Sequence, residues 1–199
     1  MSTEDHNIAW YEKHAAEYAA DAVTHDMSWP YRDFLSNLGA PLEGKRVIDL
    51  GCGSGRDLVH FKQHGLDAEG IDACASFCVK ARELSGAPVR HMKFSKLDLM
   101  KESYDGIFAN AVLMHIEVDQ RESVAQKLVS SLKVGGILYF HNPRGEGKQI
   151  CADGRVIHLT EKWPEFFESL GLSSLLNERR PAFLPREDQT WQAGIFVRN

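Results

Sequence analysis

A buried strand that runs directly into a glycine-rich turn constrains this chain more than any other stretch. Residues 46–57 read R-V-I-D-L-G-C-G-S-G-R-D, with Gly51, Gly53 and Gly55 at alternate positions after the apolar strand residues. Glycine allows the backbone angles that such a turn needs, and it lets a ligand lie against the main chain. The free amides of the following helix favour an anionic group. The stretch therefore predicts a strand, a ligand-binding turn and a helix.

The spacing of the glycines excludes two common phosphate-binding motifs. A dinucleotide fingerprint G-x-G-x-x-G needs a glycine at position 56, where the chain has Arg56. A P-loop needs a Gly-Lys-Ser/Thr end, and none follows these glycines. A purely structural glycine turn remains open at this point.

Length and charge point to one α/β domain over residues 1–199 that binds a small molecule. Acidic residues outnumber basic ones by five, 28 against 23, and no run of Lys or Arg occurs, which argues against a nucleic-acid partner. The polar start and the absence of a long apolar stretch predict a cytoplasmic protein without a membrane contact. The four cysteines form no C-x-x-C pair, so we expect no metal site.

Strand and helix patterns alternate along the chain and predict a doubly wound, mostly parallel sheet. Residues 1–40 read as two helices, the first with Tyr11, Ala15, Tyr18 and Ala22 at helical spacing. Asn142–Arg155 reads as a flexible lid or substrate loop. The predicted strands cover 47–50, 68–71, 89–94, 104–109 and 137–140, and two antiparallel strands follow at 172–179 and 191–198.

Acidic residues follow two of the predicted strands, at the edge where such sheets bind ligands. Asp72, about twenty residues after the glycine turn, can accept two hydrogen bonds from a ribose diol, or it can cap the helix that follows. Asp98 can accept from the exocyclic amine of adenine while the amide of Leu99 donates to a ring nitrogen; otherwise it is a loop acid. Both acids suit an adenosine-containing cofactor.

The order of these motifs resembles the class I S-adenosylmethionine (SAM) dependent methyltransferases, from Tyr11 to the C-terminus. The resemblance rests on the glycine motif, the two acids, the run Y-D-G-I-F-A-N-A-V-L-M-H-I-E, the turn L-K-V-G-G-I-L and the antiparallel finish. Small bacterial enzymes with type 11 or type 12 methyltransferase domains are the most similar. The resemblance implies a seven-stranded, Rossmann-like sheet of order 3-2-1-4-5-7-6 with its last strand antiparallel. It also implies a helical cap over residues 1–40 and a SAM-binding core over 41–199.

The resemblance also implies roles for particular residues toward SAM, whose product is S-adenosylhomocysteine (SAH). It places the backbone of Gly51, Gly53 and Asn110 along the methionine part, with the ammonium held by Asp49 and the carboxylate by Arg56. The remaining positions are Asp72 on the ribose, Ala73, Asp98 and Leu99 around the adenine, and Tyr11 and Tyr18 in the helix that closes over the cofactor. The run D-A-C-A-S-F departs from the more usual D-x-S of the family, so the surroundings of the adenine stay open.

Two histidines follow the fourth and fifth predicted strands and are candidates for a catalytic base. His115 and His141 both titrate near neutrality in their unperturbed state, so either can deprotonate a hydroxyl or an amine; His115 can instead anchor its loop. We expect an enzyme that methylates a small molecule, as a monomer or a homodimer. A protein- or RNA-modifying methyltransferase, a non-catalytic SAM-binding module and a metalloid methyltransferase remain alternatives.

Overall fold

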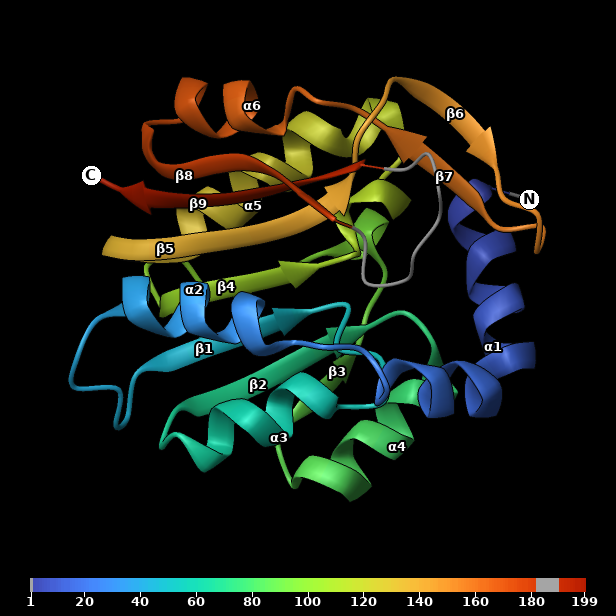
Figure 1. Ribbon diagram of the computed structural model, residues 1–199, viewed down its shortest axis with the longest axis horizontal. Helices are drawn as coiled ribbons and strands as arrows, with labels where there is room; N and C mark the ends of the chain where they lie inside the picture. Colours follow the sequence, from blue (N-terminus) through green and yellow to red (C-terminus); the bar gives the residue numbers. More distant parts are fainter. Residues whose placement is uncertain (1, 182–189) are drawn as a thin grey trace.

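A computed structural model of the protein describes residues 2–181 and 190–199. Its centre is a seven-stranded sheet (Figure 1). The strands follow the order β3-β2-β1-β4-β5-β9-β8. The first five are parallel, β9 is antiparallel to β5, and β8 is antiparallel to β9. Their bounds in this order are Val89–His91, Asp67–Asp72, Arg46–Leu50, Tyr104–Asn110, Leu132–Pro143, Thr190–Arg198 and Leu172–Pro181. The predicted order and the antiparallel ending are confirmed.

Helices cover both faces of this sheet, as the alternating pattern predicts (Figure 1). On one face, α2 (Ser28–Leu38), α3 (Arg56–Gln63) and α4 (Ala75–Ser85) share a core with β1, β4 and β5. On the other face, α5 (Arg121–Ser131) and α6 (Trp163–Ser169) bury their apolar side chains against the same strands. Both faces of the central strands are therefore buried away from water, which explains the continuous runs of apolar residues in these strands.

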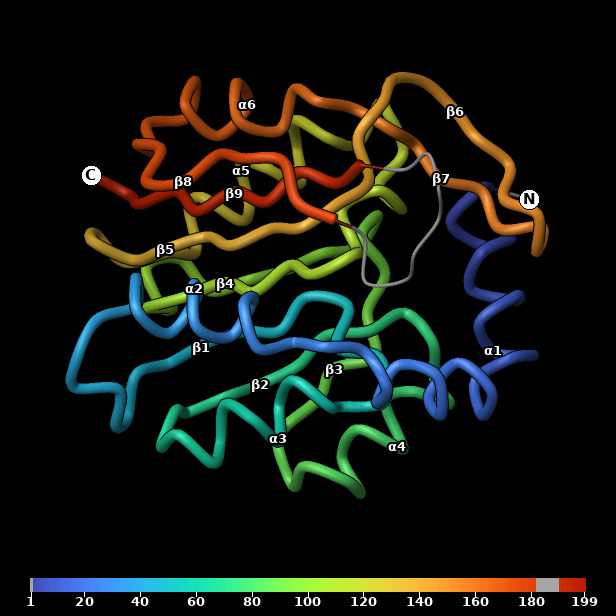
Figure 2. The backbone as a smooth tube through the Cα atoms, in the orientation of Figure 1, coloured from blue at the N-terminus to red at the C-terminus, as the bar shows by residue number. Residues whose placement is uncertain are grey.

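The two N-terminal helices do not form one cap. α1 (Thr3–Ala22) runs along the carboxyl edge of the sheet, whereas α2 packs on the sheet face through Phe34 and Leu38, which are almost fully buried. Figure 2 shows α1 beside β6 and β7, which come from much later in the chain. Of these two helices, it is therefore α1 that covers the carboxyl edge, where a parallel sheet binds its ligands.

The segment predicted as a flexible loop, Asn142–Arg155, is strand over six of its fourteen residues. β5 continues to Pro143, and β6 (Gly147–Ile150) pairs antiparallel with β7 (Val156–Leu159) in a separate hairpin. The hairpin forms because Ile157 and Leu159 of β7 bury themselves against Met114, a contact that the local sequence does not reveal.

Two predicted boundaries also move. β3 ends at His91, and a short 3₁₀ turn, η1 (Phe94–Lys96), occupies the residues after it. β5 begins at Leu132, so the expected Gly135-Gly136 turn is an irregularity inside the strand, where the register with β4 shifts. Among the helices of the described residues, none combines the length and the apolar character that a bilayer crossing needs.

Candidate functional site

A cavity of about 470 Å³ lies at the carboxyl edge of β1, β2 and β4. The glycine turn, the end of β2 and the segment after β4 form its floor, and α1 and the β6–β7 hairpin cover it. Its volume falls in the range of about 300–1,000 Å³ typical of small-molecule sites. We call α1 together with the hairpin the cover of the cavity.

The first two glycine positions of the turn require glycine for different physical reasons. Gly51 adopts a φ of +73°, and a Cβ there would lie 2.3 Å from Cγ2 of Val112, so this position accepts no side chain. Gly53 also has a positive φ, +52°, but a Cβ there would meet nothing within 4 Å. Both line the cavity. The open space above Gly53 is the room that a ligand needs to lie against the backbone.

Asp72 holds the glycine turn and the start of α4 together. Its Oδ2 accepts a hydrogen bond of 2.9 Å from the Gly53 amide, and its Oδ1 accepts one of 2.8 Å from the Cys74 amide. Burial raises the pKa of Asp72 to about 6, while these amides act in the opposite direction. A carboxylate has about four acceptor positions, so Asp72, which lines the cavity beside Ala73, keeps capacity for a ligand.

Two buried oxygen atoms near the ends of β1 and β4 have no hydrogen-bond partner within the described residues. They are Oδ2 of Asp49, which is 2 % exposed, and Oδ1 of Asn110, which lines the cavity. Burial, and then the charge of Asp57, raise the pKa of Asp49 well above its usual value. Asp49 itself does not line the cavity. Unsatisfied buried polar atoms are rare, so Oδ1 of Asn110, which lies at the cavity, is an acceptor that a ligand can use.

Arg56 lines the cavity but is already engaged. It makes two hydrogen bonds to Asp57, of 2.7 and 3.0 Å, and a third of 2.6 Å to the carbonyl oxygen of Ala22 at the end of α1. Tyr31 donates to Asp57 at 2.5 Å. Asp57 therefore aligns Arg56, the predicted partner of the SAM carboxylate, and this role of Asp57 was not predicted from the sequence.

The structure does not bring Asp98 and Leu99 to the cavity. The amide of Asp98 donates to the sulfur of Met92, its carbonyl accepts from Arg90, and Leu99 packs against the core. Met92 and Phe94 line the cavity instead. The expected adenine contacts of Asp98 and Leu99 therefore do not fit this geometry, because β3 ends at His91, before the predicted boundary.

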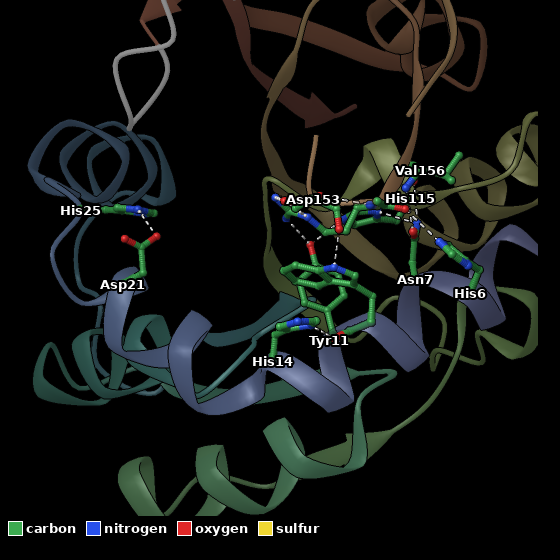
Figure 3. Close-up of polar contacts among 12 residues, drawn as sticks. His6, Asn7, Tyr11, His14, Asp21, His25, His115, Asp153 and Val156 are labelled. Atoms are coloured by element: carbon green, nitrogen blue, oxygen red, sulfur yellow. Dashed lines mark hydrogen bonds and ion pairs between the residues drawn. The ribbon is translucent and has the colours of Figure 1, made fainter. Parts of the chain in front are cut away.

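His115 lies between two side chains of α1 (Figure 3). Its Nε2 is 3.1 Å from the Tyr11 hydroxyl oxygen, and its Nδ1 is 3.3 Å from Nδ2 of Asn7. Burial, and then the positive charge of Arg155, lower the pKa of His115 to about 4. At neutral pH this imidazole is uncharged and is a weak base.

His141 is fully buried and does not line the cavity. Its ring packs edge-on against Trp29, with centroids 4.8 Å apart, and in a tilted arrangement against Trp191, with centroids 4.6 Å apart. Burial, and then the charge of Arg180, lower its pKa to about 3. His141 therefore lies inside the sheet and away from the cavity, and its position gives no support to the predicted role as a catalytic base or substrate contact.

The cover is held by side chains that the sequence analysis missed. Asn7 pairs with the backbone of Val156 in both directions, donating at 2.6 Å and accepting at 2.9 Å, and Trp10 donates to the Asp153 carbonyl at 2.7 Å (Figure 3). Asn7 has the same helical spacing as Tyr11 and Tyr18, so its face could have been predicted. Nothing local in the sequence points to the hairpin.

Arg155 joins the two halves of the cover. It forms an ion pair of 2.6 Å with Asp153 and donates to the Tyr11 hydroxyl at 2.9 Å. Tyr11 and Tyr18 also pack with Ala15, Cys74 and Phe77. Both tyrosines line the cavity.

The sequence of this chain is similar to the sequences of known methyltransferases. A family model described as "Methyltransferase domain" matches residues 48–140. Phosphoethanolamine N-methyltransferase 1 of Arabidopsis thaliana is 28 % identical over 143 residues, which is 66 % of this chain and 29 % of that protein. Arsenite methyltransferase of Mus musculus is 30 % identical over 136 residues, 59 % of this chain and 36 % of that protein. The chain thus spans less than a third of the length of the first of these relatives.

A solved structure extends the likeness to the whole chain. The 1,6-didemethyltoxoflavin-N1-methyltransferase of Burkholderia thailandensis, with bound 1,6-didemethyltoxoflavin and SAH, superposes with a TM-score of 0.77 at 16 % identity. The superposition covers 100 % of this chain and 92 % of that one. At this identity it shows a common fold.

Proposed function

We propose that the chain is a class I SAM-dependent methyltransferase, and that it transfers a methyl group from SAM to a small-molecule acceptor and releases SAH. The observation that carries the proposal is the covered cavity, which joins the glycine turn and Asp72 on one side to Tyr11 and His115 on the other. A cavity of about 470 Å³ under a cover suits a cofactor with a small acceptor.

The described residues fit SAM at each of its polar ends. The backbone at Gly53 leaves room for the methionine part, and the unpaired Oδ1 of Asn110 suits its ammonium. The carboxylate suits Arg56, because a guanidinium has five N–H groups and its three hydrogen bonds leave two. The free acceptor positions of Asp72 suit the ribose hydroxyls. Met92 and Phe94, in place of Asp98 and Leu99, offer apolar surface to the adenine.

SAM, when bound, would supply a methyl group on a cationic sulfur, with the neutral thioether of SAH as the leaving group. What the chain supplies is alignment, and well-oriented reactions gain on the order of 7–11 kcal/mol from it. Neither His115 nor His141 has the pKa of a general base near neutrality. We therefore favour an acceptor whose nucleophile is unprotonated at the working pH, with any proton leaving to water.

A macromolecular acceptor is the second candidate, and the cover disfavours it. A protein or RNA segment needs an open, extended surface, whereas α1 and the hairpin are tied together across the cavity by Asn7, Trp10 and Arg155. Incubation of the protein with labelled SAM and cell lysate separates the two. Label recovered in small molecules supports the proposal, and label recovered in protein or RNA contradicts it.

Calorimetric titration with SAM and with SAH tests the cofactor. We expect binding in the micromolar range, about −8 kcal/mol, and we expect Asp72→Asn to weaken it by roughly 1–3 kcal/mol through lost charge-assisted hydrogen bonds. Asp67→Asn, at the exposed start of the same strand, is the matched control and should leave the affinity unchanged. Folded wild-type protein that binds neither compound would refute the proposal.

A further inference from the structure

Three aromatic rings of α1 converge on one positive charge inside the cover. The guanidinium carbon of Arg155 lies 4.8, 5.5 and 5.8 Å from the ring centroids of Trp10, Tyr11 and Tyr18. Tyr11 meets the other two rings edge-on, at 5.3 and 5.2 Å, so the rings form angled walls. All four side chains line the cavity. We call these three rings the aromatic cage.

The cage and its surroundings have the chemistry of a cation site. Aromatic faces attract a cation that lies within about 6 Å of the ring centroid, and the attraction is stronger when the pair is shielded from water. The Arg155 side chain is only 12 % exposed, and the Asp153 carboxylate adds a full negative charge at 2.6 Å. The Tyr11 hydroxyl oxygen lies 3.1 Å from Nε2 of His115 and accepts a hydrogen bond from Arg155, so the cage lies beside His115 under the cover (Figure 3).

The rest of the cavity does not favour an anionic acceptor. Of the cavity residues that the structure describes, the two arginines each already pair with an aspartate, Arg56 with Asp57 and Arg155 with Asp153. No lysine lines the cavity in the same part of the chain. The two remaining N–H groups of Arg56 are assigned to the carboxylate of SAM, so a phosphate or carboxylate on the acceptor would have to separate Arg155 from Asp153 to find a cationic partner.

We propose that the aromatic cage and Asp153 form a subsite for a cationic nitrogen of the acceptor, and that Arg155 is a tethered occupant which this nitrogen replaces. Exchange of one cation for another leaves the rings and Asp153 satisfied in both states, so the replacement conserves the main attractions. Arg155 lies in the short turn between β6 and β7, where its side chain can leave the cage without disturbing the sheet. The cation bound here is assigned to the methyl acceptor, and this assignment rests on the proposed methyl transfer.

A quaternary ammonium ion and its uncharged isostere test the subsite. The probes are choline and 3,3-dimethylbutan-1-ol, which have the same shape and differ in charge, titrated into SAH-saturated protein so that no sulfonium is present. We expect choline to bind at least tenfold more tightly than the alcohol. Equal affinity for the two probes would overturn the proposal, because it would mean that the cage recognises shape alone.

Two substitutions of Arg155 test its role as the occupant. Arg155→Met removes the internal cation and should raise choline affinity at least tenfold, whereas Arg155→Lys retains a cation and should stay near wild type. Lys148→Met, on an exposed position of the same hairpin, is the matched control and should change nothing. Unchanged or weaker choline binding by Arg155→Met, with SAH binding retained, would show that Arg155 is only a structural link.

A third substitution keeps the test decisive if Arg155→Met disturbs the cover. Trp10→Leu removes the ring nearest the guanidinium and should lower choline affinity at least tenfold, and unchanged affinity would refute the cage. If SAH does not bind at all, the proposed function fails by itself. The same comparisons on the protein without SAH still decide the cation subsite.

Discussion

Glu12 offers the sharpest test of how the cover closes, because it caps a helix other than its own. α4 has no side-chain cap from Cys74, the residue at its N-terminus. Instead, the Glu12 carboxylate of α1 accepts hydrogen bonds from the amides of Ala75 and Ser76 and, at 2.5 Å, from the Ser76 hydroxyl. Partial burial raises the pKa of Glu12, but the hydrogen bonds from Ser76 and Ala75 outweigh it, so the pKa lies below its usual value.

Glu12→Gln should loosen α1 without unfolding the protein. The substitution keeps one acceptor oxygen and removes the charge, and helix caps are worth about 0.5–2 kcal/mol, with a further contribution from the helix dipole. A loss of about 1–2 kcal/mol raises the open population of α1 roughly 5- to 30-fold. Hydrogen exchange of residues 3–22 should speed up by that factor, while β1, β4 and β5 keep their protection.

The control and the pH dependence decide whether the reasoning holds. Glu17→Gln makes the same change on the same helix at an exposed side chain and should leave exchange unchanged. Because the folded pKa of Glu12 is lowered, its contribution is present above the unfolded value of about 4.3 and is lost as pH falls through the folded value. Exchange in α1 that is equal in wild type and Glu12→Gln would refute the role of this cap.

Three further predictions follow from burial and steric fit. Burial lowers the pKa of His141 to about 3, so as the pH falls the unfolded chain takes up a proton before the folded protein does. The free energy of unfolding should therefore fall by roughly 3 kcal/mol between pH 6.5 and pH 4. Urea titrations should show this fall in the wild type and not in His141→Phe. Gly51→Ala should abolish SAH binding and lower the melting temperature, whereas Gly44→Ala, with a similar φ but nothing within 4 Å, should cost only about 1–2 kcal/mol and retain binding. Phe34→Ala should cost about 3–5 kcal/mol in urea unfolding, because this fully buried ring joins α2 to the sheet.

The sequence predicted the floor of the cavity well because its signals are local. A strand, a glycine turn and a helix occupy one continuous stretch, and Asp72 follows its strand directly, so periodicity and spacing alone place Gly51, Gly53 and Asp72 at one edge. Where a strand boundary was wrong, the predicted site residues lie away from the cavity. β3 ends at His91, and Met92 and Phe94 line the cavity where Asp98 was expected.

His141 shows how a strand boundary decides a functional assignment. The prediction ended the fifth strand at Phe140, which would leave His141 in a loop at the ligand edge. β5 in fact continues through Pro143, so His141 pairs with Asn110 on one side and Ala193 on the other, inside the sheet. The extension depends on β9, some fifty residues later, and no pattern within the strand itself records that partner.

The cover could not be predicted for the same reason, and its construction has a dynamic consequence. Its contacts join residues far apart in the chain, as Asn7 joins Val156 and Tyr11 joins Arg155. They are mostly polar, and the apolar clusters beneath the cover are small, in contrast to the two large cores on the faces of the sheet. Segments with few buried apolar contacts open at lower free energy than the core, so α1 can admit a ligand while the sheet stays folded. Since Arg155 both links the cover and fills the aromatic cage, a cation that displaces it should bind and loosen the hairpin in one step.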